Sequence, residues 1–127
     1  MRATDCHKLF RAERARFAHI FPHVARSSLT IYEGRCGPHK LHCAQRDVAW
    51  THPASGEVFL VRRALRLSRN NLVALLRHEL AHVALPNLSE VETDALASAI
   101  GGRTIQYDRR EIQTLGRGGP RPRHLHQ

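Results

Sequence analysis

The chain has 127 residues, 42% of them hydrophobic, and 20 Lys and Arg against 11 Asp and Glu give it a formal net charge of +9 at pH 7. This length suits one domain with a hydrophobic core, and no apolar run approaches the length of a membrane span, so we expect a soluble globular protein. The basic charge favours nucleic acid or an acidic partner, but the scattered arginines lack interleaved aromatic residues, so we expect at most weak nucleic-acid contact.

The first predicted element is a helix from Thr4 to about Phe21. Apolar residues recur there at roughly helical spacing among charged residues, and Pro22 ends the pattern. We interpret this helix as scaffold. The same segment lacks the apolar core of a secretory signal and carries Asp5 and Glu13, so we expect a cytoplasmic protein.

The three cysteines are an odd number and do not resemble the framework of a small secreted domain, so we expect reduced thiols. The stretch CGPHKLHC gathers Cys36, His39, His42 and Cys43. These side chains could hold a structural zinc, although their spacing is not that of a zinc finger. The alternative is a loop and strand edge with incidental histidines.

Three stretches predict short β-strands, namely SLTIYEG, LHCAQRDVAW and GEVFLV. THPASG, between the last two, has the turn residues of a hairpin loop. Together with the helices they predict an α+β fold with a small antiparallel sheet of about three strands.

Two helices are predicted after the sheet. In the first, leucines recur at helical spacing, Ser68 or Asn70 can cap its start, and Pro86 ends it. Ser89 begins the second, because SEVE matches the S-x-x-E capping box, in which Glu92 reaches back to the amide of Ser89.

The second of these helices is expected to stop at Gly101 and Gly102. RTIQY then predicts a last short strand, and the tail GRGGPRPRHLHQ is too rich in Gly, Pro and Arg to pack. We therefore expect one domain over residues 1–115 and a flexible basic tail over residues 116–127.

The motif HELAH places His78, Glu79 and His82 in the middle of the first of these two helices. An α-helix turns about 100° per residue, so the two histidines lie about 40° apart and both imidazoles can reach one ion. Glu79 can flank that ion and take a proton from a bound water. This is the H-E-x-x-H pattern of zinc hydrolases, which predicts Zn²⁺ as cofactor. The alternative is ordinary core or surface histidines.

Three acids on the next helix are candidates for a third ligand: Glu90, Glu92 and Asp94. Glu90 and Asp94 share a face, whereas Glu92 is turned about 200° from Glu90, so both glutamates cannot face one metal. Glu92 has another role in the capping box, which favours Glu90. Ala97 and Gly101 continue the stripe, and their small size would let the two helices approach closely.

LLRHELAHVAL followed by SEVETDALASAIGG resembles the metallopeptidase core of the gluzincins and of the ImmA/IrrE-type bacterial and phage proteases. In these enzymes an HExxH helix precedes a helix that reads E-x-x-A-[DN]-x-x-A. The resemblance covers about residues 58–102. Thr93 stands where alanine is usual, and only seven residues separate His82 from Glu90, so the choice between Glu90 and Glu92 stays open.

Matched position by position, the resemblance implies zinc ligands at His78, His82 and Glu90. It implies that Glu79 is the catalytic base and that Asp94 orients a histidine. The implied function is a zinc-dependent metallopeptidase that hydrolyses peptide bonds of a protein or peptide substrate.

On the substrate side, the resemblance places the strand EVFLVRRAL beside the substrate cleft. Its residues from Val58 to Val61 could hold an extended peptide by adding it as a further strand. An oxyanion stabiliser is also needed, and Tyr107 and Tyr32 are the candidates.

Competing interpretations remain. SprT-like DNA-associated proteases share HExxH but use a histidine as third ligand, and here the histidines after His82 are His124 and His126 in the tail. A basic nucleic-acid- or protein-binding module, with a structural metal or none, is the alternative from another class. Hydrolysis of a non-peptide amide would use the same chemistry at the carbonyl.

Overall fold

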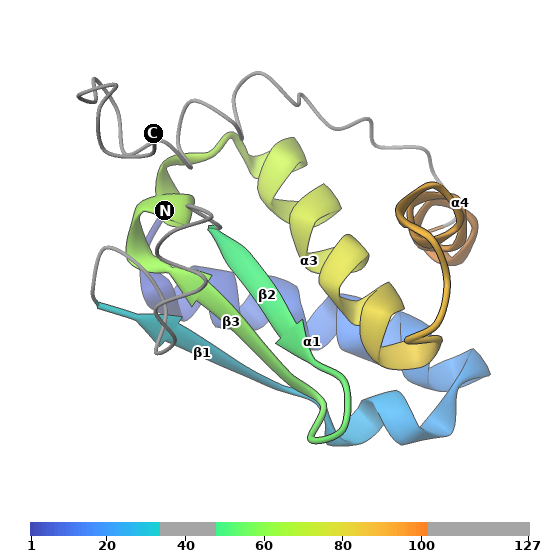
Figure 1. The fold of residues 1–127 in the computed structure, drawn as a ribbon. Coiled ribbons are helices and arrows are strands. Elements are labelled where there is room, and N and C mark those ends of the chain that lie inside the picture. Colours follow the sequence, from blue (N-terminus) through green and yellow to red (C-terminus); the bar gives the residue numbers. More distant parts are fainter. Residues whose placement is uncertain (34–47, 102–127) are drawn as a thin grey trace, which may run out of the picture.

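The computed structural model describes residues 1–33 and 48–101, and its elements are labelled in Figure 1. The predicted zinc group of CGPHKLHC, the strand RTIQY and the tail lie outside the described residues. Within them the fold is α+β, as predicted. The elements are α1 (Ala3–Ile20), η1 (Pro22–Arg26), β1 (Ser28–Tyr32), β2 (Ala49–His52), β3 (Glu57–Val61), η2 (Arg62–Arg66), α3 (Arg69–Ala84) and α4 (Glu90–Gly101).

N-terminal caps determine where α3 and α4 begin, the two helices that carry the predicted metal ligands. The amide of Asn71 donates to Ser68 Oγ at 3.4 Å, so Ser68 rather than Asn70 caps α3. At the start of α4, the amide of Ser89 donates to Glu92 Oε1 at 2.9 Å, and the amide of Glu92 donates to Ser89 Oγ at 3.2 Å. The predicted capping box is confirmed.

Helix α3 lies between the sheet and α4 (Figure 1), and it contacts β2, α1 and α4. From Asn71 to Ala84 all of its side chains are buried except those of His78 and His82. This explains why apolar residues surround the helix instead of forming one stripe. The same helix reaches solvent at the two histidines of the HELAH motif.

The sheet has the strand order β1-β3-β2 and is mixed. β3 pairs antiparallel with β2, as predicted, but parallel with β1, so the prediction of an antiparallel sheet is wrong for that pair. The cause is the apolar run Val58–Val61, which is buried throughout and takes the central position. Because strands pair with both of its edges, β3 cannot add a peptide strand, and that prediction is wrong as well.

The β2–β3 hairpin places β2 beside α3. β2 continues through Thr51 and His52, which were predicted to be part of the turn. The turn is therefore shorter, and the amide of Gly56 donates to the carbonyl oxygen of His52 at 2.9 Å. Gly56 has φ 76°, a conformation that favours glycine. The two added strand residues bring Thr51 to α3.

Helix α1 covers the core with one face, on which Cys6, Phe10 and Phe17 are buried. Cys6 is a free thiol, and burial raises its pKa to about 11. Cys36 and Cys43 lie outside the described residues. In the described part of the chain, no helix has both the length and the apolar character that crossing a membrane requires.

Candidate metal centre

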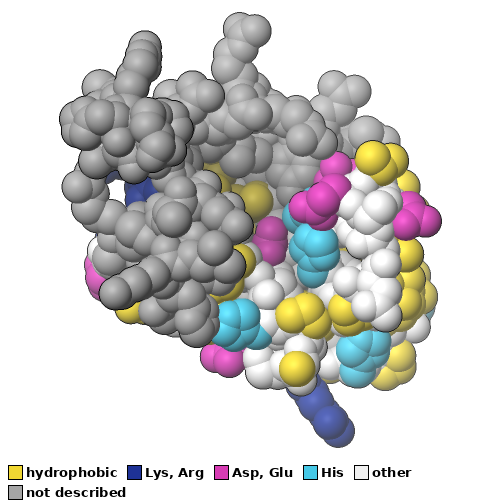
Figure 2. Space-filling view, viewed as in Figure 1, with side chains coloured by type: hydrophobic (Ala, Val, Ile, Leu, Met, Phe, Trp, Pro, Cys, Tyr) yellow, Lys and Arg dark blue, Asp and Glu magenta, His cyan; other side chains and the backbone are white. Residues whose placement is uncertain are grey.

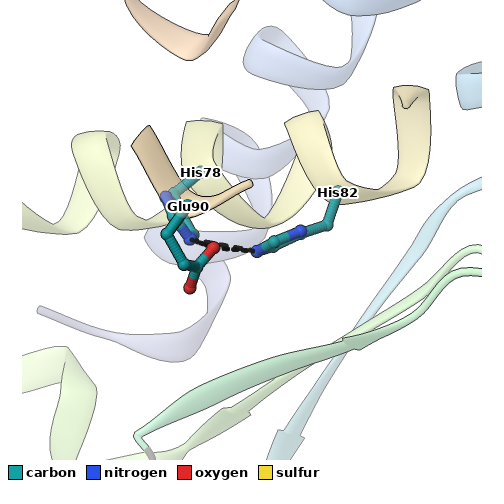
Figure 3. A group of neighbouring side chains, drawn as sticks. All are labelled: His78, His82 and Glu90. Atoms are coloured by element: carbon teal, nitrogen blue, oxygen red, sulfur yellow. Dashed lines mark hydrogen bonds and ion pairs between the residues drawn. The ribbon is translucent and has the colours of Figure 1, made fainter. Parts of the chain in front are cut away.

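The imidazoles of His78 and His82 on α3 and the carboxylate of Glu90 on α4 point toward one another (Figure 3). Glu90 Oε2 lies 3.1 Å from His82 Nε2 and 3.4 Å from His78 Nε2. The two Nε2 atoms are 3.1 Å apart, and their rings are nearly perpendicular, at 83°. One atom from each of three side chains therefore converges on a single point.

The spacing of these three atoms suits a tetrahedral metal ion. Zinc binds imidazole nitrogen and carboxylate oxygen at about 2.0–2.2 Å, so two ligands of a tetrahedral zinc are separated by about 3.3 Å. The three observed separations, 3.1, 3.1 and 3.4 Å, lie close to that value. The ligand atoms thus need little rearrangement to hold an ion.

Asp94 fixes the orientation of His78. Its Oδ1 lies 2.6 Å from His78 Nδ1, one turn after Glu90 on the same helix. A carboxylate accepts a hydrogen bond at this distance, so Nδ1 of His78 is the donor, and in this tautomer Nε2 carries the lone pair. That lone pair and the carboxylate of Glu90 are both acceptors, and a cation between them satisfies both.

Glu79 lies beside this group and is only 5% exposed. The hydroxyl of Thr51 lies 2.6 Å from its Oε1 and 3.2 Å from its backbone oxygen, and donates its proton to the nearer carboxylate oxygen. Thr51 thus occupies one oxygen of Glu79. Within residues 1–33 and 48–101, no side chain hydrogen-bonds to the other oxygen, which is the one we assign to proton transfer.

Burial raises the pKa of Glu79 above its usual 4.5, and this is the largest effect on the group. The hydrogen bond from Thr51 and the nearby His78 and His82 act in the opposite direction, and the carboxylate of Glu90 adds to the increase. A carboxyl group with a raised pKa holds a proton more firmly than an exposed one. This is the property that a general base needs, because it must later release the same proton to a leaving group.

The group is open on the side of Glu90, whose side chain is 72% exposed, against 12% for His78 and 24% for His82. Figure 2 shows histidine and acidic side chains together on this face. Residues 78–101 contain four acids and no Lys or Arg. In a chain of net charge +9, this segment is therefore locally negative and attracts cations.

Helix α4 approaches α3 through small side chains. Thr93, Ala97 and Gly101 are buried at four-residue intervals. Thr93 stands where the resemblance has alanine, and its hydroxyl donates to the carbonyl oxygen of Ser89 at 2.8 Å. A threonine is tolerated there because its one polar group has a partner inside the helix.

The structure separates the remaining candidates. Glu92 does not face the histidines; its carboxylate accepts from Ser89, and these hydrogen bonds lower its pKa. Tyr32 lies on β1, at the opposite edge of the sheet from β2 and Thr51. Tyr107 is outside the described residues.

The sequence did not predict a role for Thr51, because nothing in THPASG indicates a threonine that contacts a glutamate 28 residues later.

Two imidazoles and one carboxylate form a ligand set that zinc takes in catalytic sites with three protein ligands. Here they come from adjacent helices, with a buried acid beside them. Comparisons of this chain with known protein families, with curated proteins and with solved structures give no match.

Proposed function

We propose that this protein is a zinc-dependent metallopeptidase that hydrolyses peptide bonds of a protein substrate. The observation that carries the proposal is the convergence of His78, His82 and Glu90 within 4.8 Å of one another. A second observation is the buried carboxylate of Glu79 next to them. A site that only stabilised the fold would not need an acid there, because burial of an unused carboxylate destabilises the protein.

His78, His82 and Glu90 would hold the metal, and three protein ligands leave one position open for water or substrate. Zinc in such a site supplies Lewis acidity, which polarises a carbonyl and makes water more acidic. Glu79 takes the proton of the attacking water and later delivers it to the leaving amine. Thr51 holds Oε1 of Glu79, so that Oε2 carries out the transfer.

The experiment compares the wild-type protein with a Glu79→Gln variant. Both are purified, their zinc content is measured, and both are incubated with a mixed peptide library whose products are identified by mass spectrometry. We expect both proteins to retain zinc and the variant to lose cleavage by about 10²–10⁴-fold, the usual contribution of a general base. Glutamine keeps the shape and the hydrogen-bonding capacity of the side chain without its proton affinity.

Glu57→Gln is the matched control, because Glu57 is a glutamate on β3, hydrogen-bonded to Ser55 rather than to a group of the site. It should cleave as the wild type does. Cleavage that persists in Glu79→Gln would remove the proposed base. Zinc in the wild type without cleavage of any peptide in the library would favour the alternative of a binding module with a structural metal.

A further inference from the structure

A buried ion pair joins α1 to α3 one residue before His78. Arg77 Nε lies 2.6 Å from Glu13 Oε1, and both side chains are 7% exposed. Arg16 approaches the other carboxylate oxygen of Glu13 at 3.7 Å. Removing either partner of such a pair destabilises the folded protein, because the remaining charge would be buried without compensation. The proposed chemistry uses neither Glu13 nor Arg77.

The last residue of α4 lies directly against this ion pair. A Cβ atom on Gly101 would lie 2.7 Å from Arg77 Cζ, 3.0 Å from its Nε and closer still to its Nη1, so either the guanidinium group or the helix would have to shift. Arg16 Nη1 also donates to the carbonyl oxygen of Gly101 at 3.5 Å. Cations are favourable at a helix C-terminus because they meet its partial negative charge. Because Gly101 has no side chain, the C-terminal end of α4 can pack directly against the guanidinium group of Arg77.

Along its length α4 packs against α3, with Thr93, Ala97 and Gly101 buried and with Leu96 and Ile100 partly buried against the core. The three buried side chains are small and interdigitate less than large ones, so packing alone fixes the position of α4 along α3 less tightly than large side chains would. The polar contacts at the two ends of α4 add to this packing in setting its position. One end is the metal centre, and the other is the contact of Gly101 with Arg77.

We propose that Glu13 and Arg77 are positioning residues that hold the C-terminal end of α4 so that Glu90 meets the two imidazoles. The inference rests on the metal centre of the proposed function. The 12 residues of α4 place Glu90 about 16 Å from Gly101, so a tilt at one end moves the other. Metal sites tolerate errors of only about 0.2 Å in ligand distances, so this movement weakens metal binding.

The test measures the zinc affinity of the metal-free protein by competition with a chromogenic chelator. Gly101→Ala places a methyl group against Arg77, whose guanidinium is paired with Glu13, so either α4 must shift or the ion pair must give way. We expect its Kd for zinc to rise at least about tenfold, the lower range for loss of a supporting group in a metal site. Glu13→Gln, which removes the anion that holds Arg77, should raise the Kd in the same direction.

Two controls separate positioning from a loss of stability. Ala99→Val adds bulk on the exposed face of the same last turn and should leave the Kd unchanged. Val58→Ala removes buried volume from β3 and should lower Tm without changing the Kd. A folded Gly101→Ala protein with the wild-type Kd would overturn the inference, and if that variant does not fold, Glu13→Gln decides by the same criterion. A wild-type chain without zinc affinity would instead refute the metal centre itself.

Discussion

Glu79 is an acid buried among apolar residues of α3, with the hydroxyl of Thr51 as its partner. A protein that only needed to fold would be more stable with a neutral residue there. Burial next to the imidazoles of His78 and His82 is typical of functional sites. In such sites a buried acid has a shifted pKa, and its burial makes the folded protein less stable. Two predictions at the scale of the residue follow from it.

The first concerns the stability of the metal-free protein as a function of pH. Because the pKa of Glu79 is raised above its usual 4.5 in the folded state, its contribution to stability is full below that pH. It is lost as the pH rises through the raised value. Glu79→Gln should therefore gain stability, and hence Tm, relative to the wild type as the pH rises above about 4.5. Thermal melts across this range would contradict the account if the two proteins kept a constant difference.

The second prediction concerns Thr51. Thr51→Val keeps the shape of the side chain but removes the hydroxyl that orients Glu79, a hydrogen bond to a charged group that contributes about 1.5–3 kcal/mol. We expect kcat to fall about tenfold while zinc content is unchanged, and Thr51→Ser to restore most of the rate. Equal rates for the valine and serine variants would show that the hydroxyl has no part in catalysis.

These contacts mark the limit of what the sequence could predict at single residues. The positions of His78, Glu79 and His82 follow from helix geometry, because all three lie within one and a half turns. Thr51 meets a residue 28 positions away, and Glu13 meets Arg77 across 64 positions. No local pattern contains such contacts, since they depend on how separate elements pack.

At the scale of the element, α4 depends on its capping box. Glu92 has a lowered pKa because its carboxylate accepts hydrogen bonds from the backbone and the hydroxyl of Ser89. Its contribution to stability is therefore present above pH 4.5 and is lost as the pH falls through the lowered value. The start of α4 also carries Glu90, the proposed metal ligand, so the cap orders the turn from which that side chain extends.

We predict that Ser89→Ala lowers the stability of the metal-free protein by about 1 kcal/mol, the usual effect of removing an N-cap side chain. Amide hydrogen exchange should show the loss in the first turn of α4 and not in α3. Ser55→Ala, at the exposed hairpin turn, is the control and should leave exchange in α4 unchanged. Equal exchange in α4 for the wild type and Ser89→Ala would contradict this role of the cap.

The helices could be predicted more accurately than the sheet, for a physical reason. Caps such as Ser68 and Ser89 act within four residues, so the bounds of α3 and α4 can be read locally. Strand order depends on which strand most needs burial, and the apolar run Val58–Val61 takes the centre only because two other strands and the helices cover it. The prediction that this strand pairs with an added peptide strand was wrong for that reason.

At the scale of the whole molecule, charge is unevenly distributed along the described chain. Residues 62–77 contain five arginines and no acid, whereas residues 78–101 contain four acids and no Lys or Arg. A net charge of +9 would by itself repel a divalent cation. The local negative segment provides the attraction that the chain as a whole lacks, and it coincides with the converging imidazoles.

The central claim is that His78, His82 and Glu90 together hold one divalent ion, and calorimetric titration of the metal-free protein with zinc tests it most directly. Glu90→Gln and Glu92→Gln form a matched pair, because the two glutamates lie two residues apart on one helix and only Glu90 faces the histidines. We predict one zinc per wild-type chain, an affinity about 100-fold weaker or worse in Glu90→Gln, and no change in Glu92→Gln. No zinc binding by the wild type, or loss of binding in Glu92→Gln but not in Glu90→Gln, would contradict the claim.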